Sequence, residues 1–487
     1  ASICTKDGEI LMTTNGMQLY SNHFGSIIDT MAYGYYWDYY AGSRPFGFPR
    51  FNAALILPIP GGLDTQYSIL YHNAELEVET SFQFTKILEA RIRLENTGFP
   101  TVVYQDSVIA PYHKFYHPAI SATRHANGRD WWVIVFERSS DKYYRYLLDP
   151  NGVEYKGLDS VSQTIRSGLA YQNFSPSGNL YIRLDGITFD EGQYVSIFSF
   201  DRCEGKMNFL TQLHTSAGTF AGAVVSPSEQ FLYIDNKDTL WQFDLFASDI
   251  QASQILIDTN RGFTWPGWIR EGFGPLVNAP DGRIYMISSN GGSHSLSVID
   301  RPDEPGIECR FLQNEIILPT FTSRSPPNVA NFRLGPIDGS ACDSLGKNNL
   351  PVSRWRWELQ DSLDPFTIRF TDLSFFRPEV WLWDFDDGMT SDLSHPIHTY
   401  TTPGLYHVCL TVSNEYATDS MCRWVEVKDI TSTSDVTDSP SFQVQPNPFV
   451  DFLEIVPDED GYHLYDMTLI DIFGRVVLDQ TMTLPGR

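Results

Sequence analysis

The chain has 487 residues, of which 42% are hydrophobic and 19% charged. This length favours several domains over a single core. The formal net charge of −26 repels phosphate backbones and anionic lipids, which argues against nucleic acid as a partner and is typical of a soluble surface outside the cell. No apolar run approaches the roughly 20 residues that a membrane-spanning helix needs, so we expect no transmembrane segment.

Aromatic residues make up 14% of the chain, with 25 Tyr and 32 Phe. Flat and β-branched side chains suit the pleated surface of a sheet, and runs of good helix formers at helical spacing are few. We therefore predict an all-β protein.

A turn followed by an alternating strand recurs in the first 340 residues. Three clear copies are 175–182, 226–234 and 279–286, spaced by roughly 50 residues. A unit of this size cannot bury its own hydrophobic face, so it must stack on its neighbours. We predict a β-propeller over residues 1–340. Six units are visible, and pieces at 324–336 leave six and seven blades both open.

The unit that begins at Ala221 shows the expected blade in full. Its strands are predicted at 222–225, 230–235, 239–244 and 254–258. Most copies have a glycine in the turn after the first strand, and Glu229 fills that slot here. Because every blade needs such a turn, we interpret the turns as scaffold and expect any local function where the repeat breaks.

One such break is the aromatic segment 31–51. Its exposed rings could bind sugar or protein, because Tyr and Trp make large contacts at low entropic cost. The alternative is a long loop that folds over the propeller and packs on it. The candidate binding residues are Tyr33, Tyr35, Tyr36, Trp37, Tyr39 and Tyr40.

The rest of the chain divides at two polar stretches. Residues 341–350 are predicted as a linker, 351–428 as a compact β domain, 429–441 as a second linker and 442–487 as a further strand-rich domain.

The cysteines indicate the compartment. Cys409 and Cys422 flank a four-residue loop and fall opposite each other on a hairpin, close enough for a disulfide. A disulfide implies an oxidising compartment. The other four lack metal-ligand spacing, and either buried thiols or bridges would explain them. They are Cys4, Cys203, Cys309 and Cys342.

Residues 351–428 resemble a PKD domain, an immunoglobulin-like β-sandwich of extracellular proteins. The resemblance rests on Phe370–Ser374, on the run Trp383-Asp384-Phe385-Asp386-Asp387-Gly388 and on His395–Tyr400. The family usually has Gly in place of Asp386, so we expect an altered turn with the fold retained. Trp383 and Phe385 should point one way and pack the sandwich.

The acidic residues of that run are the best cation candidates of the chain. Carboxylate oxygens near a turn suit Ca²⁺, but the spacing of Asp384, Asp386 and Asp387 does not match a complete Ca²⁺ loop. Turn formation is the alternative explanation. We expect no other metal and no cofactor.

Residues 442–487 look like the C-terminal sorting domain of proteins exported by the type IX secretion system of Bacteroidetes-type bacteria. The resemblance implies a small β-sandwich, of which we expect the C-terminal part to be incomplete here. The residues that carry the resemblance are Pro446, Asn447, Pro448, Phe449, Gly474 and Arg475. The first 340 residues, too, are similar to propellers that precede PKD domains in such secreted proteins.

No nucleophile elbow, HExxH helix, P-loop or dinucleotide-binding motif is present. We predict a secreted, non-catalytic protein of the outer cell surface. Its propeller would serve as a platform for adhesion or for homo- or hetero-assembly, its PKD domain as a spacer and its C-terminal domain as an export signal. The expected partners are the type IX secretion machinery and other surface proteins or glycans. The alternative is a propeller enzyme or glycan-binding protein acting on extracellular polysaccharide.

Overall fold

The computed structural model is all-β, and the structural statements below concern the residues that it describes. These are 1–4, 9–14, 18–21, 25–28, 54–61, 65–78, 81–95, 100–110, 120–137, 140–162, 169–186, 192–216, 221–262, 264–265, 269–289, 293–319, 326–361, 364–428, 442–445, 454–457, 462–470 and 476–485. The chain divides into two compact units. The first comprises residues 1–358, 369–398 and 406–425, and the second 359–368, 399–405 and 426–487.

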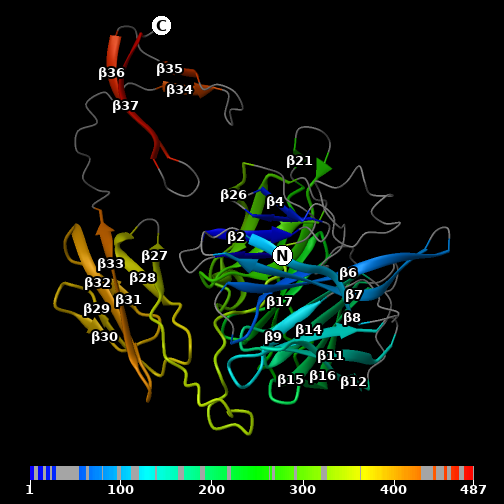
Figure 1. Cartoon of the computed structure of the whole chain (residues 1–487). Coiled ribbons are helices and arrows are strands. Elements are labelled where there is room, and N and C mark those ends of the chain that lie inside the picture. Colours follow the sequence, from blue (N-terminus) through cyan, green and yellow to red (C-terminus); the bar gives the residue numbers. More distant parts are fainter. Residues whose placement is uncertain are drawn as a thin grey trace. The chain divides into compact units, whose positions relative to one another are not determined.

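Six four-stranded antiparallel sheets follow one another in the described part of residues 1–317, each joined in simple up-and-down order (Figure 1). Blade 1 consists of β1 (Ser2–Cys4), β2 (Ile10–Thr14), β3 (Leu19–Ser21) and β4 (Gly25–Ile28). Blade 2 consists of β5 (Ala54–Pro58), β6 (Gln66–Val78), β7 (Ser81–Leu94) and β8 (Pro100–Ala110). Blade 3 consists of β9 (Ser121–Arg124), β10 (Trp131–Phe136), β11 (Lys142–Asp149) and β12 (Gly152–Ser160).

Blade 4 consists of β13 (Leu169–Phe174), β14 (Leu180–Gly186), β15 (Gln193–Asp201) and β16 (Lys206–Thr215). Blade 5 consists of β17 (Ala223–Val225), β18 (Phe231–Asp235), β19 (Thr239–Asp244) and β20 (Ile255–Thr259). Blade 6 consists of β23 (Phe273–Asn278), β24 (Ile284–Ser288), β25 (Ser295–Ile299) and β26 (Phe311–Ile317). A small hairpin, β21 (Thr264–Trp265) and β22 (Ile269–Arg270), lies between blades 5 and 6. A 3₁₀ turn, η2 (Gly306–Cys309), precedes β26.

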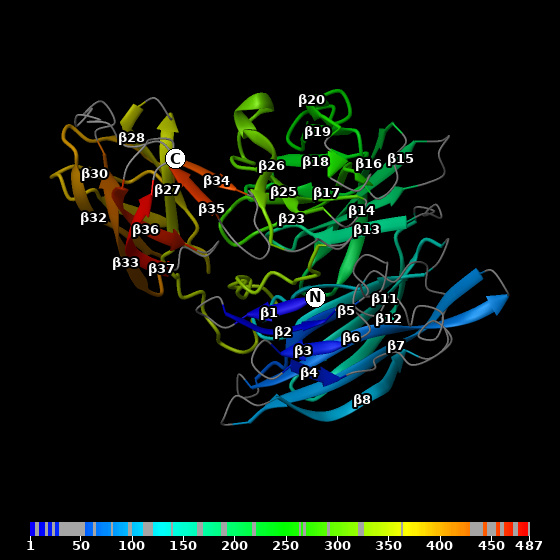
Figure 2. The same cartoon turned by 90° about the horizontal axis from the view of Figure 1, so that it is seen from above.

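The propeller predicted from the repeat is confirmed, and the described strands make six blades. The strands of the fifth blade fall within a residue or two of their predicted positions. The sequence leaves residues 324–336 open as part of a seventh blade; the described ones, 326–336, contain no strand. The hydrophobic core is shared between successive blades because each blade buries one face against the next. One cluster joins blades 1 to 3, and others join blades 3 and 4, 4 and 5, and 5 and 6. Figure 2 shows the strands of these blades from above.

In the turn after the first strand of a blade, one residue has a left-handed backbone conformation, which explains why glycine recurs there. Gly128, Gly178 and Gly282 have φ of 70°, 74° and 79°, a region that glycine enters without steric cost. Glu229 occupies the same slot with φ 63°. A residue with a Cβ is strained there, so Glu229 must gain something that glycine cannot provide.

The PKD region forms two sheets, β27-β28-β31 and β30-β29-β32-β33. Their strands are β27 (Trp355–Asp361), β28 (Asp364–Asp372), β29 (Val380–Asp384), β30 (Thr390–Ser391), β31 (Ile397–Thr399), β32 (Gly404–Ser413) and β33 (Thr418–Val427). Trp383 and Phe385 are both buried, as predicted, and each packs against Phe370 with ring centroids 5.4 and 5.2 Å away.

Two hairpins lie in the C-terminal part of the chain. They are β34 (Phe442–Gln445) with β35 (Glu454–Pro457), and β36 (Tyr462–Ile470) with β37 (Val476–Pro485). No helix in the described parts of the chain is long and apolar enough to cross a membrane.

Candidate functional site

The turns of the repeat bind residues 326–340, which we call the exit strap because they leave the last blade. The strap has no strand of its own, so its polar groups need partners elsewhere. Strap side chains donate to backbone carbonyls of several blades, and Arg202 of blade 4 donates to a carbonyl of the strap. The contacts are Asn328 Nδ2 to the carbonyls of Ala54 (2.9 Å) and Ile120 (2.8 Å), Asn331 Nδ2 to Pro176 (2.7 Å), Arg333 Nη1 to Pro280 (2.7 Å) and Arg202 Nη2 to Gly335 (2.6 Å).

Neighbouring turns also bind one another. Glu229 Oε1 accepts a hydrogen bond of 2.7 Å from the backbone amide of Ser177 in the preceding blade. Asp303 Oδ1 accepts one of 2.9 Å from the amide of Ser228. These bonds link the turns of blades 4, 5 and 6, and they give the strained Glu229 a contact that glycine cannot make.

A disulfide fixes the chain just after the strap. Cys203, in the turn that follows β15, is bonded to Cys342. The sequence left this pairing open, because the two residues are 139 positions apart. Asn349 Nδ2 donates to Asp338 Oδ2 at 2.6 Å and to the carbonyl of Pro336 at 3.0 Å, so residues 341–350 are bound to the strap.

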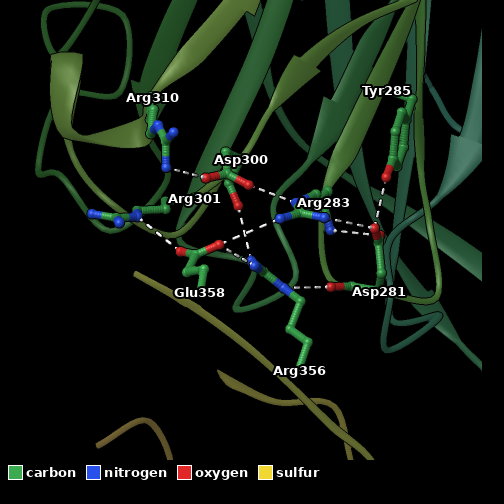
Figure 3. Close-up of polar contacts among 8 residues, drawn as sticks. All are labelled: Asp281, Arg283, Tyr285, Asp300, Arg301, Arg310, Arg356 and Glu358. Carbon is green, nitrogen blue, oxygen red and sulfur yellow. Dashed lines mark hydrogen bonds and ion pairs between the residues drawn. The ribbon is translucent and has the colours of Figure 1, made fainter. Parts of the chain in front are cut away.

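A dense group of charged side chains lies where blade 6 meets the first strand of the PKD region, within the first unit. We call it the Glu358 cluster (Figure 3). Its members are Asp281, Arg283, Tyr285, Asp300, Arg301, Arg310, Arg356 and Glu358.

Glu358 is the centre of this cluster. Its Oε1 accepts a hydrogen bond from Arg301 Nε at 3.0 Å, and its Oε2 accepts from Arg356 Nη1 at 2.5 Å and Arg283 Nη2 at 3.3 Å. The Glu358 side chain is only 11% exposed. Three guanidinium groups therefore surround one largely buried carboxylate, and two of them come from the propeller.

Arg283 binds three carboxylates at once. Its Nε lies 2.5 Å from Asp300 Oδ1 and its Nη1 3.5 Å from Asp281 Oδ2, in addition to the contact with Glu358. Burial lowers the pKa of Arg283, but the nearby carboxylates of Asp300 and Asp281 outweigh it, so the pKa is raised. Arg356 completes the joint by donating to the backbone carbonyls of Asp281 (2.9 Å) and Asp300 (3.0 Å).

The chemistry of the cluster is that of a structural joint. Each of its carboxylates binds at least one guanidinium. Tyr285 donates to Asp281 Oδ2 at 2.6 Å, and burial together with this bond raises the pKa of Tyr285 to about 12. A phenol with that pKa stays protonated at neutral pH, so it is not prepared to act as a base. A second contact of the same kind joins Arg369 to Glu304.

Two buried carboxylates of the propeller, Asp185 and Asp235, also bind groups of the propeller. Arg183 Nε lies 2.8 Å from Asp185 Oδ1, and both side chains are 2% exposed. Burial raises the pKa of Asp185 and outweighs the neighbouring guanidinium. Asp235 accepts from the amide of Gly222 at 2.6 Å, and burial raises its pKa as well. Both groups stabilise neighbouring backbone or side chains inside the blades.

The three PKD aspartates bind parts of their own domain. Asp384 Oδ1 accepts from the amide of Asp386 at 3.0 Å, and Asp386 Oδ2 from the amide of His407 at 2.8 Å. Asp387 Oδ1 accepts from the amide of Met389 at 3.0 Å, and its Oδ2 lies 2.8 Å from His398 Nε2. These are the contacts of turn-forming residues, the alternative to Ca²⁺ that the sequence left open.

The turn at Asp386 has an unusual backbone conformation. Asp386 has φ 63°, the left-handed conformation that a glycine takes most easily. Asp386 thus occupies a conformation that favours glycine, and the two sheets of the domain are retained. Aspartate tolerates this region better than most residues, and its bond to His407 offsets part of the strain.

The other predicted site residues have different outcomes. Cys409 and Cys422 form the disulfide that their register indicates. Cys4 is a free exposed thiol, and Cys309 is a free buried one whose pKa burial raises to about 11. The aromatic candidates Tyr33, Tyr35, Tyr36, Trp37, Tyr39 and Tyr40 lie outside the described residues. The sorting-motif residues Pro446, Asn447, Pro448, Phe449, Gly474 and Arg475 also lie outside them.

Sequence reasoning did not find the Glu358 cluster. Arg283 directly follows the turn of the sixth unit, Asp281-Gly282, which we assigned to the scaffold. The available signal was weak. The sixth unit has Asp281 and Arg283 at the positions where an earlier copy has Ser177 and Asn179. Its partner Glu358 is 75 residues further on, and only the tertiary structure brings them together.

Comparison with known proteins defines one part of the chain. Residues 358–428 match the PKD domain family. The first PKD domain of the Vibrio cholerae metalloprotease PrtV is 26% identical, covering 16% of this chain and 99% of that one, with a TM-score of 0.15. No curated protein is similar to the chain in sequence.

Two larger structures are similar over more of the chain. A Lactobacillus plantarum protein is 13% identical and covers 63% of this chain and 93% of its own, with a TM-score of 0.35. The periplasmic gluconolactonase of Pseudomonas aeruginosa is 13% identical and covers 73% and 96%, with a TM-score of 0.29. The sheet topology of the described residues and the match of residues 358–428 together define an all-β protein with a propeller and a PKD domain.

Proposed function

We propose that this protein is a non-catalytic component of the bacterial outer surface, in which the propeller presents a binding or assembly face and the PKD domain acts as a spacer. The observation that carries this proposal is that the charged side chains of the Glu358 cluster bind one another. The Glu358 cluster joins blade 6 to the PKD strand β27 through ion pairs and hydrogen bonds, and a spacer needs such a firm attachment. A catalytic site would instead direct such groups towards a substrate.

The disulfides support a location outside the reducing cytoplasm. Cys203–Cys342 and Cys409–Cys422 would persist in an oxidising compartment. The resemblance to PKD domains described above also implies an extracellular protein. Export through the type IX secretion system belongs to the same proposal and rests on the resemblance of residues 442–487.

The test is expression of the chain in a bacterium that has a type IX secretion system, with and without residues 442–487. Surface biotinylation of whole cells should label the full chain and fail to label the shortened one. Intact mass of the labelled protein then shows whether the C-terminal segment is removed. Equal labelling of both forms would contradict the sorting role.

The binding role is tested by crosslinking on the cell surface, followed by identification of the partners. We expect a surface protein or glycan. The double variant Tyr36→Ala with Trp37→Ala should lose binding to a glycan array if the aromatic segment is the binding element. Turnover of a polysaccharide, peptide or sugar lactone by the purified chain would overturn the non-catalytic proposal.

A further inference from the structure

Buried oxygen atoms at the end of the exit strap lack a hydrogen-bond donor. Residues 338–343 form a loop of two successive turns, with bonds from the Ser340 amide to the carbonyl of Ile337 (3.1 Å) and from the Asp343 amide to that of Ser340 (3.0 Å). Within the part of the chain that the structure describes, three side-chain oxygens of this loop are buried and have no partner. They are Asp338 Oδ1, Ser340 Oγ and Asp343 Oδ1. Buried polar atoms normally have a partner, so these three indicate a ligand.

The two carboxylates of the loop lie close together. Asp343 Oδ2 accepts a hydrogen bond of 3.2 Å from the amide of Gly339, the residue after Asp338. The pKa of Tyr416 is raised, first by its hydrogen bond with Glu415. The negative charges of Asp338 and Asp343 raise it further, so both carboxylates lie near the same phenol.

Contacts outside the loop fix its shape. Asp338 Oδ2 accepts from Asn349 Nδ2 at 2.6 Å and lies 3.4 Å from Arg377 Nη1. The Asp338 side chain is 6% exposed, whereas that of Arg377 is 56% exposed, so water screens the guanidinium and it offsets only part of the negative charge. The Cys203–Cys342 disulfide holds the backbone beside Asp343. The oxygens without partners are therefore held in place without a cation of the chain among them.

The chemistry of these oxygens suits Ca²⁺. A cation can bind all three, whereas one water molecule cannot donate to all of them. Carboxylate and hydroxyl oxygens are hard ligands, unlike the nitrogen and sulfur that zinc and copper prefer. Ca²⁺ accepts irregular sets of about six to eight oxygens at about 2.3–2.6 Å, while Mg²⁺ demands a near-ideal octahedron. Gly339 and Ala341 are exposed, so water can supply the remaining ligands.

We propose that the 338–343 loop binds one Ca²⁺ ion through Asp338 Oδ1, Ser340 Oγ and Asp343 Oδ1. The ion balances the two carboxylates and connects the end of the exit strap to residues 341–350. Because Asp338 also binds Asn349 and Arg377, calcium stiffens the chain between the last blade and the PKD region.

The experiment uses the full chain with its disulfides intact, treated with a chelator and dialysed into calcium-free buffer. Calorimetric titration should show one Ca²⁺ site with a dissociation constant of about 0.1–1 mM, the range of extracellular modules. Asp338→Asn with Asp343→Asn should abolish binding in this range. Ser340→Ala should raise the dissociation constant about threefold or more, because one ligand is lost.

Ser340→Ala is the decisive variant. The Ser340 hydroxyl makes no hydrogen bond among the described residues, so its removal breaks no contact of the fold. The matched control is Asp384→Asn, which changes the cation candidate of the PKD region and should keep the affinity. Circular dichroism of every variant separates a lost ligand from lost folding.

Thermal unfolding provides a second readout. About 10 mM Ca²⁺ should raise the melting temperature of the natural chain by about 2–4 °C, and the same concentration of Mg²⁺ should raise it less. The double asparagine variant should show no such difference between the two ions. The proposal is overturned if the natural chain binds no Ca²⁺ up to about 10 mM, if a folded Ser340→Ala variant keeps its affinity, or if Asp384→Asn abolishes binding and the loop variants do not.

Discussion

Glu229 accepts a 2.7 Å hydrogen bond from the backbone amide of Ser177, across the boundary between blades 5 and 4. The same Glu229 has φ 63°, in a turn where the equivalent residues are glycines. One residue thus combines a backbone strain with a contact between blades, and the two effects can be separated by mutation.

Glu229→Ala should destabilise the protein by about 1–2 kcal/mol, because the strain remains while the amide of Ser177 loses its acceptor. Glu229→Gly relieves the strain and should cost less than Glu229→Ala. Glu229→Gln keeps an acceptor and should lie closest to the natural protein. Urea unfolding of the three variants measures the order. An alanine variant as stable as the glycine variant would contradict this explanation.

Glu358→Gln should destabilise the first unit by about 2–4 kcal/mol, because three guanidinium groups would lose the charge that balances them. The matched control is Glu154→Gln, which removes one partner of the exposed Lys156–Glu154 pair and should change stability by less than about 0.5 kcal/mol. Unfolding in urea at low and high salt measures both variants. Equal effects at the two sites would show that the Glu358 cluster contributes nothing special.

His72 should make the protein less stable in acid. Burial lowers its pKa to about 3 in the folded chain and outweighs a backbone hydrogen bond at Lys86 that raises it. An unfolded histidine titrates near 6.5, so the unfolded state binds the extra proton between these values. The contribution of His72 is therefore complete above pH 6.5 and is lost as the pH falls towards 3.

The measurement is the free energy of unfolding in urea between pH 4 and 7. His72→Phe should flatten its pH dependence by up to about 1.4 kcal/mol per pH unit, the value for one proton. An unchanged slope in the His72 variant would refute the assignment.

The two disulfides should contribute unequally to stability. Their cysteines are 139 and 13 residues apart, and loop-closure entropy gives about 5 and 3 kcal/mol respectively. Cys203→Ser with Cys342→Ser should therefore lower the free energy of unfolding more than Cys409→Ser with Cys422→Ser. Thermal and urea unfolding of both double variants tests this order. The opposite order would mean that strain or residual structure dominates.

Much of the fold was predictable because its rules are local. The strands of blade 5 were found within a residue or two since alternation of period two and a turn of fixed chemistry define them. Register on a short hairpin likewise predicted the Cys409–Cys422 bond. Blade number was not predictable, because the sequence does not show whether residues 326–336 add to a further blade, and in the structure they bind the turns as the exit strap.

By itself, the sequence determined the all-β class, the repeating blade, the PKD domain and the hairpin disulfide, all of which depend on neighbours along the chain. Only the tertiary structure decided the Cys203–Cys342 pairing, the bond between Glu229 and Ser177 and the joint around Glu358. Those contacts depend on which blades lie side by side and where the chain leaves the last one. The physical reason is that an ion pair or disulfide between distant residues leaves no periodic trace in the sequence.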